Sequence, residues 1–354
     1  RNDISNLGKF DFINAYTALK AIIRLILILF KEKPDLVYIP ISQNKLAYLR
    51  DGILIIISKI FNSKVLLHLH GSYFLNFYDS CGTLYKKFID ISLKSADGII
   101  VLGKKLKYIF KSWFEEKKIF VLPNFARWSF EIDWDRVIVS KNDEQKVRLV
   151  YLSNIVESKG IFDLLEAIKL LKEKRYDNFE LLIAGKIGID PITGMTETET
   201  LKRFEHYLAE LKGIVYYLGH LSDDFAKYEL LRTSDIFILP SFYVYEGQPI
   251  SILEAMSCGC AIISTKDVGV IDETVIHGVN GFLVEKRNPE QLAEAISILV
   301  NDKTLIKKFG LESIKLYQNL YTPDVHIKNF KNIVKKLVDK ETYFIECVKK
   351  ANED

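Results

Sequence analysis

The fold is decided by residues 235–257, which read DIFILPSFYVYEGQPISILEAMS. The run Asp235–Leu239 is apolar and is followed by a Pro-Ser pair, which predicts a buried strand that ends in a turn. The run Ile250–Ser257 predicts a helix. Pro249 stands near its first turn, where a missing N–H removes no hydrogen bond. This segment therefore reads as a strand, a loop and a helix, the repeating unit of a parallel α/β sheet.

Two carboxylates stand eight positions apart in this unit. Glu246 is expected in the loop, and Glu254 about one turn into the helix. Two such glutamates alone are most often solvated side chains. Here they frame a helix start, whose free N–H groups and partial positive charge bind phosphate well. The order of strand, glycine-containing turn, proline and helix therefore favours a site for a nucleotide diphosphate.

The same alternation of short apolar runs and amphipathic stretches extends over the chain. It predicts strands in the first half at 35–40, 64–69, 97–102 and 119–122, with helices at 15–30, 45–60, 84–94 and 104–114. It predicts strands in the second half at 147–152, 179–184, 214–217, 235–239, 261–264 and 282–284, with helices at 161–174, 197–211, 223–233, 250–257, 289–300 and 304–317. This alternation is typical of doubly wound parallel sheets.

The alternation of apolar runs and amphipathic stretches is interrupted at residues 123–146, which indicates a region between two domains. We therefore expect a first Rossmann-like domain over 1–145 and a second over 146–321. Thr322 and Pro323 are typical of a helix start, with threonine as the cap and proline in the first turn. A final segment, 322–354, is therefore expected to begin with a helix.

Composition narrows the class of protein. Hydrophobic residues make up 49% and charged residues 27% of the 354 residues, which is ordinary for a globular protein. Four scattered cysteines are too few for a disulfide framework and favour a reducing cytosol. We interpret Cys258 and Cys260 as packed residues, because no second Cys/His pair accompanies them. The apolar run Ala21–Phe30 is too short to span a membrane and predicts a core helix.

The charge is unevenly distributed. Residues 1–140 carry 21 Lys and Arg against 13 Asp and Glu, a net +8, whereas residues 141–321 carry 21 against 27, a net −6. A basic first half suggests attraction to an anionic surface or acceptor. Within it, Lys104–Phe114 interleaves lysines with aromatic residues. This stretch could rest on anionic lipid, or form a sheet-covering helix with Leu106, Ile109 and Phe110 in the core.

Several short motifs together resemble the retaining glycosyltransferases of family 4, which have the GT-B fold. The two glutamates after a Pro-Ser turn, and the following Ala255–Gly259, carry the resemblance most strongly. The other matching stretches are Ser153–Gly160, Leu181–Gly185, Val268–Glu273, His277–Val284, His70-Gly71, Ser95–Asp97 and Pro123-Asn124. The resemblance implies two Rossmann-like domains whose parallel sheets face each other across a cleft, with the final segment 322–354 packing back on the first domain. It also implies transfer of a sugar from a nucleotide diphosphate sugar, UDP or GDP, to a hydroxyl acceptor.

The resemblance also implies roles for individual residues. His70, Lys159 and Glu246 would be catalytic, with Lys159 gripping the diphosphate and Glu246 binding the transferred sugar. His70 would face the cleft from the first domain, whereas His68, on the same face but deeper, is interpreted as packed. Glu254 would bind the ribose hydroxyls. The residues expected to bind the donor are Asn154, Lys159, Gly185, Leu221, Glu246, Gly247, Gln248, Pro249, Ile250 and Glu254.

The chain departs from the family pattern in two places. Asn154 stands where the family usually has an arginine, so Arg148 or Lys186 would have to supply that charge. The family also begins with a strand and a glycine-rich loop, which Arg1–Phe10 does not match. We therefore expect an opening β-α unit to be missing from this sequence.

Cofactors, partners and location follow from the same reasoning. We expect no metal and no cofactor, since the histidines are scattered and the pair Asp133 and Asp135 reads as solvated. The expected partners are a nucleotide sugar and an oligosaccharide or lipid-linked acceptor, with peripheral membrane contact and no nucleic acid. The expected location is the cytoplasm, at the inner face of the membrane. Two rival functions are a non-catalytic nucleotide-sugar-binding subunit and a sugar-nucleotide 2-epimerase.

Overall fold

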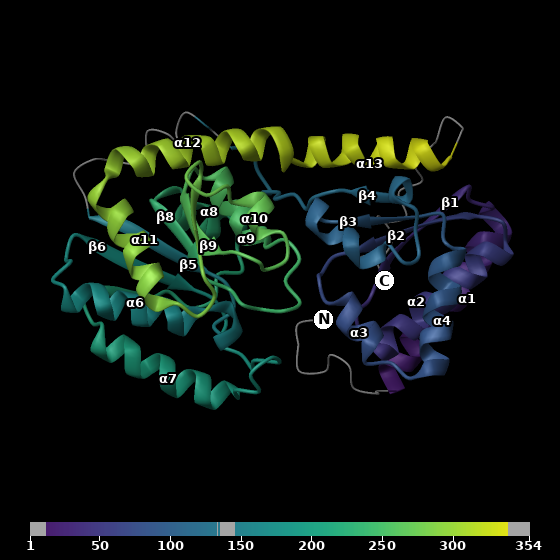
Figure 1. Ribbon diagram of the computed structural model, residues 1–354, viewed down its shortest axis with the longest axis horizontal. Helices are drawn as coiled ribbons and strands as arrows, with labels where there is room; N and C mark the ends of the chain where they lie inside the picture. Colours follow the sequence, from purple (N-terminus) through teal and green to yellow (C-terminus); the bar gives the residue numbers. More distant parts are fainter. Residues whose placement is uncertain (1–11, 133, 135–145, 339–354) are drawn as a thin grey trace.

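The computed structural model describes residues 12–132, 134 and 146–338. Figure 1 shows two α/β domains side by side, with the helices α12 (Lys303–Leu320) and α13 (Pro323–Leu337) running in succession over both. Each domain holds one parallel sheet, as the alternation of the sequence predicts. The predicted GT-B architecture is confirmed.

The first sheet has four parallel strands in the order β1-β2-β3-β4. Its strands are β1 (Leu36–Ile41), β2 (Lys64–Leu69), β3 (Gly98–Val101) and β4 (Ile119–Val121). Its helices are α1 (Phe12–Glu32), α2 (Lys45–Ile60), α3 (Phe74–Asp79), α4 (Thr83–Ser95) and the short 3₁₀ helices η2 (Lys104–Phe110) and η3 (Glu116–Lys118). No strand precedes β1 within residues 12–35.

The second sheet has six parallel strands in the order β10-β9-β8-β5-β6-β7. They are β5 (Val147–Leu152), β6 (Phe179–Ala184), β7 (Val215–Tyr217), β8 (Ile236–Leu239), β9 (Ala261–Thr265) and β10 (Gly281–Val284). Its helices are η4 (Glu157–Lys159), α6 (Ile161–Glu173), α7 (Glu197–Glu210), α8 (Asp224–Arg232), α9 (Ile250–Ser257), α10 (Ile271–Thr274), α11 (Pro289–Asn301) and α12. The chain order reverses between β5 and β8, as in a doubly wound nucleotide-binding sheet.

Helix α13 connects the end of the second domain to the first. Its start is as predicted, because the Thr322 side chain accepts a hydrogen bond from the Val325 N–H and Pro323 fills the first turn. Ile333 and Val334 are buried in a cluster with residues of β2, β3 and the end of β4. The helix thereby covers the face of the first sheet that α2 and α4 leave open.

The stretch Lys104–Phe114 corrects one prediction. Only residues 104–110 are helical, and they form the 3₁₀ helix η2. Leu106, Ile109 and Phe110 are buried in the core of the first domain. The reading of these three residues as core is confirmed.

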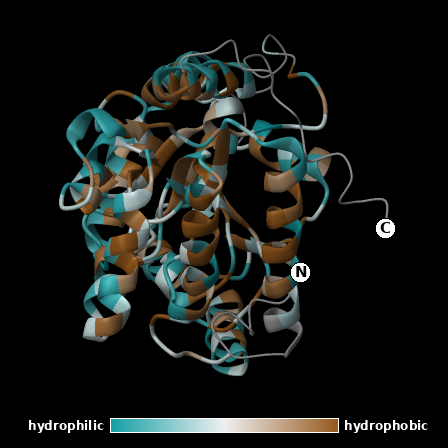
Figure 2. Ribbon diagram, turned by 90° about the vertical axis from the view of Figure 1, so that its right-hand side faces the viewer, coloured by the Kyte–Doolittle hydropathy of each residue, from teal (hydrophilic) through white to brown (hydrophobic). Residues whose placement is uncertain are grey.

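Helix α1 corrects a second prediction. The run Ala21–Phe30 is helical, but of the described α1 side chains only that of Leu29 is fully buried, whereas Phe30 is 75% and Leu27 64% exposed. The reason is that α1 packs mainly against α2, which covers only one side of the helix. Figure 2 views this domain end-on and shows hydrophobic residues on its outer helices. None of the described helices is long and apolar enough to cross a membrane.

Candidate functional site

The candidate site lies where the order of the second sheet reverses. Strands β5 and β8 are neighbours there, and the loops after them continue beyond the carboxyl edge of the sheet. Ligands of open α/β sheets bind at such a switch point, because the two loops diverge and leave a crevice. Lys159 lies on the loop after β5, and Glu246 on the loop after β8.

These two predicted residues form an ion pair. The Lys159 Nζ lies 2.5 Å from Glu246 Oε2, and their side chains are only 17% and 10% exposed. The Ser241 hydroxyl donates to the same oxygen over 3.2 Å, and the ring of Tyr243 lies 4.4 Å below the Lys159 ammonium. Positive and negative charge therefore meet in a nearly closed site.

Two glycines allow this close approach. Gly160 has φ +76°, and a Cβ there would lie 2.0 Å from the Pro240 carbonyl oxygen, so the loops after β5 and β8 could not touch. A Cβ on Gly247 would lie 2.3 Å from the carbonyl oxygen of His70, in the other domain. The glycine after Glu246 thus lets the two domains meet directly at the site.

Glu254 lies in α9, on the side that faces α8. Its side chain is 13% exposed, and Lys227 of α8 lies 3.6 Å from its Oε1. Burial raises the pKa of Glu254, Lys227 opposes that shift, and Asp224 adds to it. The carboxylate is therefore largely removed from water next to a cation, which suits a group that accepts hydrogen bonds from hydroxyls.

Gln248 has a role that sequence reasoning missed. Its side chain is 5% exposed and joins both domains: Oε1 accepts from the Asn124 N–H over 2.7 Å, and Nε2 donates to Thr274 over 2.9 Å. The amide of Asn124 also donates to the Gln248 carbonyl over 3.1 Å. The Gln248 side chain is therefore structural, whereas its backbone N–H and that of Gly247 have no acceptor in the described residues.

His70 enters the site from the end of β2. Its ring lies against that of His68, with centroids 3.9 Å apart and planes tilted by 32°, and the residue is exposed. Desolvation lowers the pKa of His70, a hydrogen bond with Asn124 opposes this, and His326 adds to the lowering. His68 is packed, as predicted: it is 1% exposed and its Nδ1 shares a hydrogen bond of 2.6 Å with the Tyr38 hydroxyl.

Of the two residues expected to replace the arginine charge missing at Asn154, Lys186 lies near that position and Arg148 does not. Arg148 lies at the amino end of β5, where its Nε donates to Glu180 over 2.8 Å, so it cannot reach the loops at the carboxyl edge. Lys186 follows β6 at the carboxyl edge, and its carbonyl accepts from the Ile155 N–H beside Asn154. Asn154 and Lys186 are both exposed there.

The remaining predicted residues surround this centre. Gly185 is buried, and its N–H and carbonyl are bonded to Gly219 and Tyr217, so its backbone is occupied within the protein. Leu221 is half-buried against the core of the second domain. Pro249 directly precedes α9, and Ile250, the first residue of that helix, is 50% exposed.

Asp190 supports the loop that carries Lys159, and sequence reasoning missed it. Its carboxylate is fully buried, one oxygen accepts from the Ser158 N–H over 2.5 Å, and the other accepts from the N–H of Ile192 and Thr193. Its bond to Ser158 has no sequence signal, because the two residues lie 32 positions apart.

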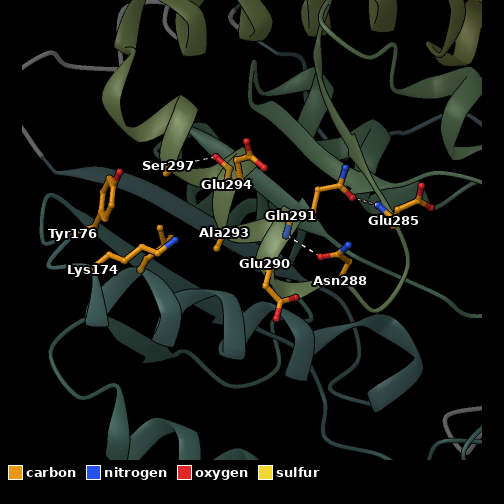
Figure 3. Close-up of a pocket in the computed structure, with 10 residues that line it drawn as sticks. Lys174, Tyr176, Glu285, Asn288, Glu290, Gln291, Ala293, Glu294 and Ser297 are labelled. Carbon is orange, nitrogen blue, oxygen red and sulfur yellow. Dashed lines mark hydrogen bonds between the residues drawn. The ribbon is translucent and has the colours of Figure 1, made fainter.

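A polar hollow of about 620 Å³ between α6 and α11 contains none of the predicted residues (Figure 3). Its polar groups bond one another: Gln291 accepts from the Glu285 N–H, and Asn288 accepts from the Gln291 N–H. Among the described residues, His, Cys, Asp and Glu form no cluster suited to a metal ion. Asp133 and Asp135 lie outside the described residues.

The chain is similar to curated glycosyltransferases. It is 27% identical over 244 residues to the capsular polysaccharide biosynthesis glycosyltransferase CapM of Staphylococcus aureus, covering 66% of this chain and 60% of CapM. It is 29% identical over 199 residues to the N,N'-diacetylbacillosaminyl-diphospho-undecaprenol alpha-1,3-N-acetylgalactosaminyltransferase of Campylobacter jejuni, covering 55% of this chain and 47% of that protein. The chain thus spans about half to three-fifths of these relatives.

A solved structure shares the fold. Anabaena HepE in complex with UDP superposes with a TM-score of 0.69 at 17% identity, covering 91% of this chain and 82% of HepE. The sequence model of the glycosyl transferases group 1 matches residues 134–315, just over half of the chain and nearly all of the second domain. The matched region holds Lys159, Glu246, Glu254 and the strands that position them, and the chain belongs to the glycosyl transferases group 1 family.

Proposed function

We propose that the protein is a retaining glycosyltransferase of family 4 that transfers a sugar from a UDP or GDP sugar to a hydroxyl acceptor. The observation that carries the proposal is the Lys159–Glu246 pair of 2.5 Å at the switch point of the second sheet. A lysine, a carboxylate and the start of α9 converge there. This combination supplies positive charge for a diphosphate and an acceptor for sugar hydroxyls.

Each residue has a role in this proposal. Lys159 and the N–H groups at the start of α9 neutralise the diphosphate as it leaves, which is the charge stabilisation that phosphoryl leaving groups need. Glu254 accepts hydrogen bonds from the ribose, and Glu246 binds hydroxyls of the transferred sugar. A diphosphate entering the site takes over Lys159, and Glu246 is then free to bind the sugar.

The transfer takes place on one face of the sugar. The bond between the anomeric carbon and the diphosphate oxygen breaks, and a new bond forms to the acceptor oxygen. The acceptor proton passes to the departing phosphate. His70 lies across the domain interface beside the reacting centre, where it can donate to or accept from sugar hydroxyls. Because Lys159 and helix N–H groups meet the phosphate charge, we expect activity without a metal ion.

The named relatives support a surface polysaccharide or glycolipid as the product. CapM is named for capsular polysaccharide biosynthesis and the Campylobacter relative for a diphospho-undecaprenol acceptor. We therefore propose a lipid-linked or oligosaccharide acceptor and peripheral contact with the cytoplasmic face of a membrane. The basic first domain and the exposed apolar side of α1 support that contact.

The test is a binding and turnover series on the full chain. Calorimetry with UDP, GDP and other nucleotide diphosphates, with and without magnesium, should show one selective, metal-independent ligand. Glu254→Ala should weaken nucleotide binding, whereas Glu246→Ala should mainly lower turnover. Equal nucleotide affinity in wild type and Glu254→Ala would contradict the ribose role. Binding without turnover would favour the non-catalytic subunit, and conversion of the nucleotide sugar alone to its epimer would favour the 2-epimerase.

A further inference from the structure

Three tyrosines extend from the ion pair to the opposite domain. This tyrosine cluster consists of Tyr243 and Tyr245, on the loop before Glu246, and Tyr73, at the start of α3. The ring centroids of Tyr243 and Tyr245 are 5.5 Å apart, and those of Tyr245 and Tyr73 are 4.4 Å apart. Since Tyr243 also lies under the Lys159 ammonium, the cluster reaches from the proposed reaction centre to the first domain.

Contacts with the backbone hold the cluster in place. The Tyr73 N–H donates to Gln43 Oε1 over 2.6 Å, and the neighbouring Ser72 hydroxyl donates to the Val244 carbonyl of the second domain over 2.9 Å. The rings of Tyr73 and Tyr245 are half-buried, so part of each remains open to solvent. Neither hydroxyl has a hydrogen-bond partner among the described residues. Ring surface and hydroxyls are therefore both available to a ligand.

We propose that Tyr73 and Tyr245 form the binding site for the acceptor sugar, whose ring stacks on them. The inference rests on the proposed function, and it adds the residues that select a pyranoside as acceptor. One face of a pyranose ring presents C–H groups, which match the negative face of an aromatic ring. The tyrosine hydroxyls can then bond the sugar hydroxyls, and a tyrosine orders at low entropy cost because it has few rotatable bonds.

The position of the cluster assigns it to the acceptor rather than to the donor. Tyr243 contacts Lys159, and Lys159 with Glu246 makes up the donor side of the site. Tyr73 belongs to the first domain and lies beyond Tyr245 from that pair. A sugar on Tyr73 and Tyr245 would therefore present its hydroxyl to the anomeric carbon from the first-domain side.

Saturation-transfer NMR on the full chain tests this site without a known acceptor. The probes are methyl pyranosides of glucose, galactose, mannose, N-acetylglucosamine and N-acetylgalactosamine, added with the nucleotide diphosphate that calorimetry selects. Stacking predicts that the C–H protons of one ring face receive the strongest signal. Tyr245→Ala and Tyr73→Ala should each bind the preferred pyranoside about tenfold more weakly, whereas the phenylalanine variants should retain stacking. Tyr108→Ala, at an exposed tyrosine of η2 outside the tyrosine cluster, should match wild type.

The nucleotide affinity of every variant is measured on the same samples. Unchanged nucleotide affinity with lost pyranoside signal in the alanine variants supports the proposal. Pyranoside binding that survives both alanine substitutions overturns it, as does a wild-type protein that binds nucleotide but none of the pyranosides. Absence of nucleotide binding in wild type would instead contradict the proposed function. Loss of the pyranoside signal in the phenylalanine variants as well would overturn the proposal that the sugar ring stacks on the tyrosine rings.

Discussion

The Lys159–Glu246 pair makes the sharpest energetic prediction. Removing one partner of a fully buried pair costs about 3–5 kcal/mol, whereas an exposed pair is worth about 0–1 kcal/mol. With side chains 17% and 10% exposed, this pair lies nearer the buried limit. Lys159→Ala leaves the buried Glu246 carboxylate with the Ser241 hydroxyl as its remaining partner. We therefore expect the free energy of unfolding to fall by about 3 kcal/mol. Glu246→Ala should cost less, about 2 kcal/mol, because the lysine can turn toward water.

A double-mutant cycle isolates the interaction. The free energy of unfolding of the double variant should fall by about 3 kcal/mol. The two single losses add up to about 5 kcal/mol, so the coupling energy is about 2 kcal/mol. The assay is urea unfolding of the full chain, followed by circular dichroism. The matched control is the pair Lys107–Glu116, which has a similar distance of 2.7 Å but side chains 25% and 61% exposed. A coupling energy equal to that of this control would refute the reasoning.

The same substitution tests the diphosphate role. If the diphosphate takes over Lys159 from Glu246, Lys159→Ala should lose more affinity for a nucleotide diphosphate than for the monophosphate. A charge-assisted contact of this kind contributes about 1.5–3 kcal/mol, or about tenfold to a hundredfold in affinity. Calorimetry with both nucleotides measures the difference. Equal losses would remove Lys159 from the diphosphate site even if the ion pair itself is confirmed.

Four further substitutions follow from the structure. Burial raises the pKa of Glu254, so this carboxyl favours folding below its unfolded pKa of about 4.5 and loses that contribution as pH rises through the raised value. Glu254→Gln should therefore be more stable than wild type at pH 7 and equal to it in acid, while it binds nucleotide more weakly; a loss of stability at pH 7 would contradict this. Burial lowers the pKa of His68 from 6.5 to about 2, so below pH 6.5 the unfolded chain binds a proton that the folded protein does not. The free energy of unfolding of wild type should therefore fall by about 2 kcal/mol between pH 6.5 and 5. In urea titrations, the stability of His68→Gln should depend less on pH. Asp190→Asn places an amide donor against a backbone N–H, so we expect about 2–3 kcal/mol lower stability and weaker diphosphate binding through a displaced Lys159; unchanged affinity would assign Asp190 to stability alone. Gly247→Ala puts a methyl group 2.3 Å from a carbonyl oxygen of the other domain, so small-angle scattering should show the domains further apart.

Local patterns predicted most of the fold. The helix Ile250–Ser257 and the strands Val147–Leu152 and Phe179–Ala184 begin and end where the sequence places them, because hydrophobic runs and turn residues are read within one element. The helix expected over Lys104–Phe114 ends early. Its first turn is fixed by Glu273 of the other domain, which accepts from two backbone N–H groups over 2.8 and 2.6 Å. A contact of that kind has no local signal.

The residues of the candidate site also fall into two groups, those with a local sequence pattern and those brought together only by the fold. Glu246 and Glu254 could be found because their spacing along one loop and helix is a pattern in itself. The pairing of Lys227 with Glu254 and that of Asp190 with Ser158 could not be found, since each joins two elements that are separate in the sequence. The sequence also assigned Lys159 and Glu246 separate ligands, and only the fold shows that they bind each other.

The uneven charge shows why composition alone does not identify a partner. The basic first domain suggested an anionic surface or acceptor outside the protein. Part of that charge is used internally, because Lys105 pairs with Asp267 and Asp272 of the acidic second domain, over 2.6 and 2.5 Å. The two domains, opposite in net charge, are therefore joined by ion pairs where they meet. The net charge of +8 therefore overstates the positive charge that the first domain can offer to the membrane contact we propose.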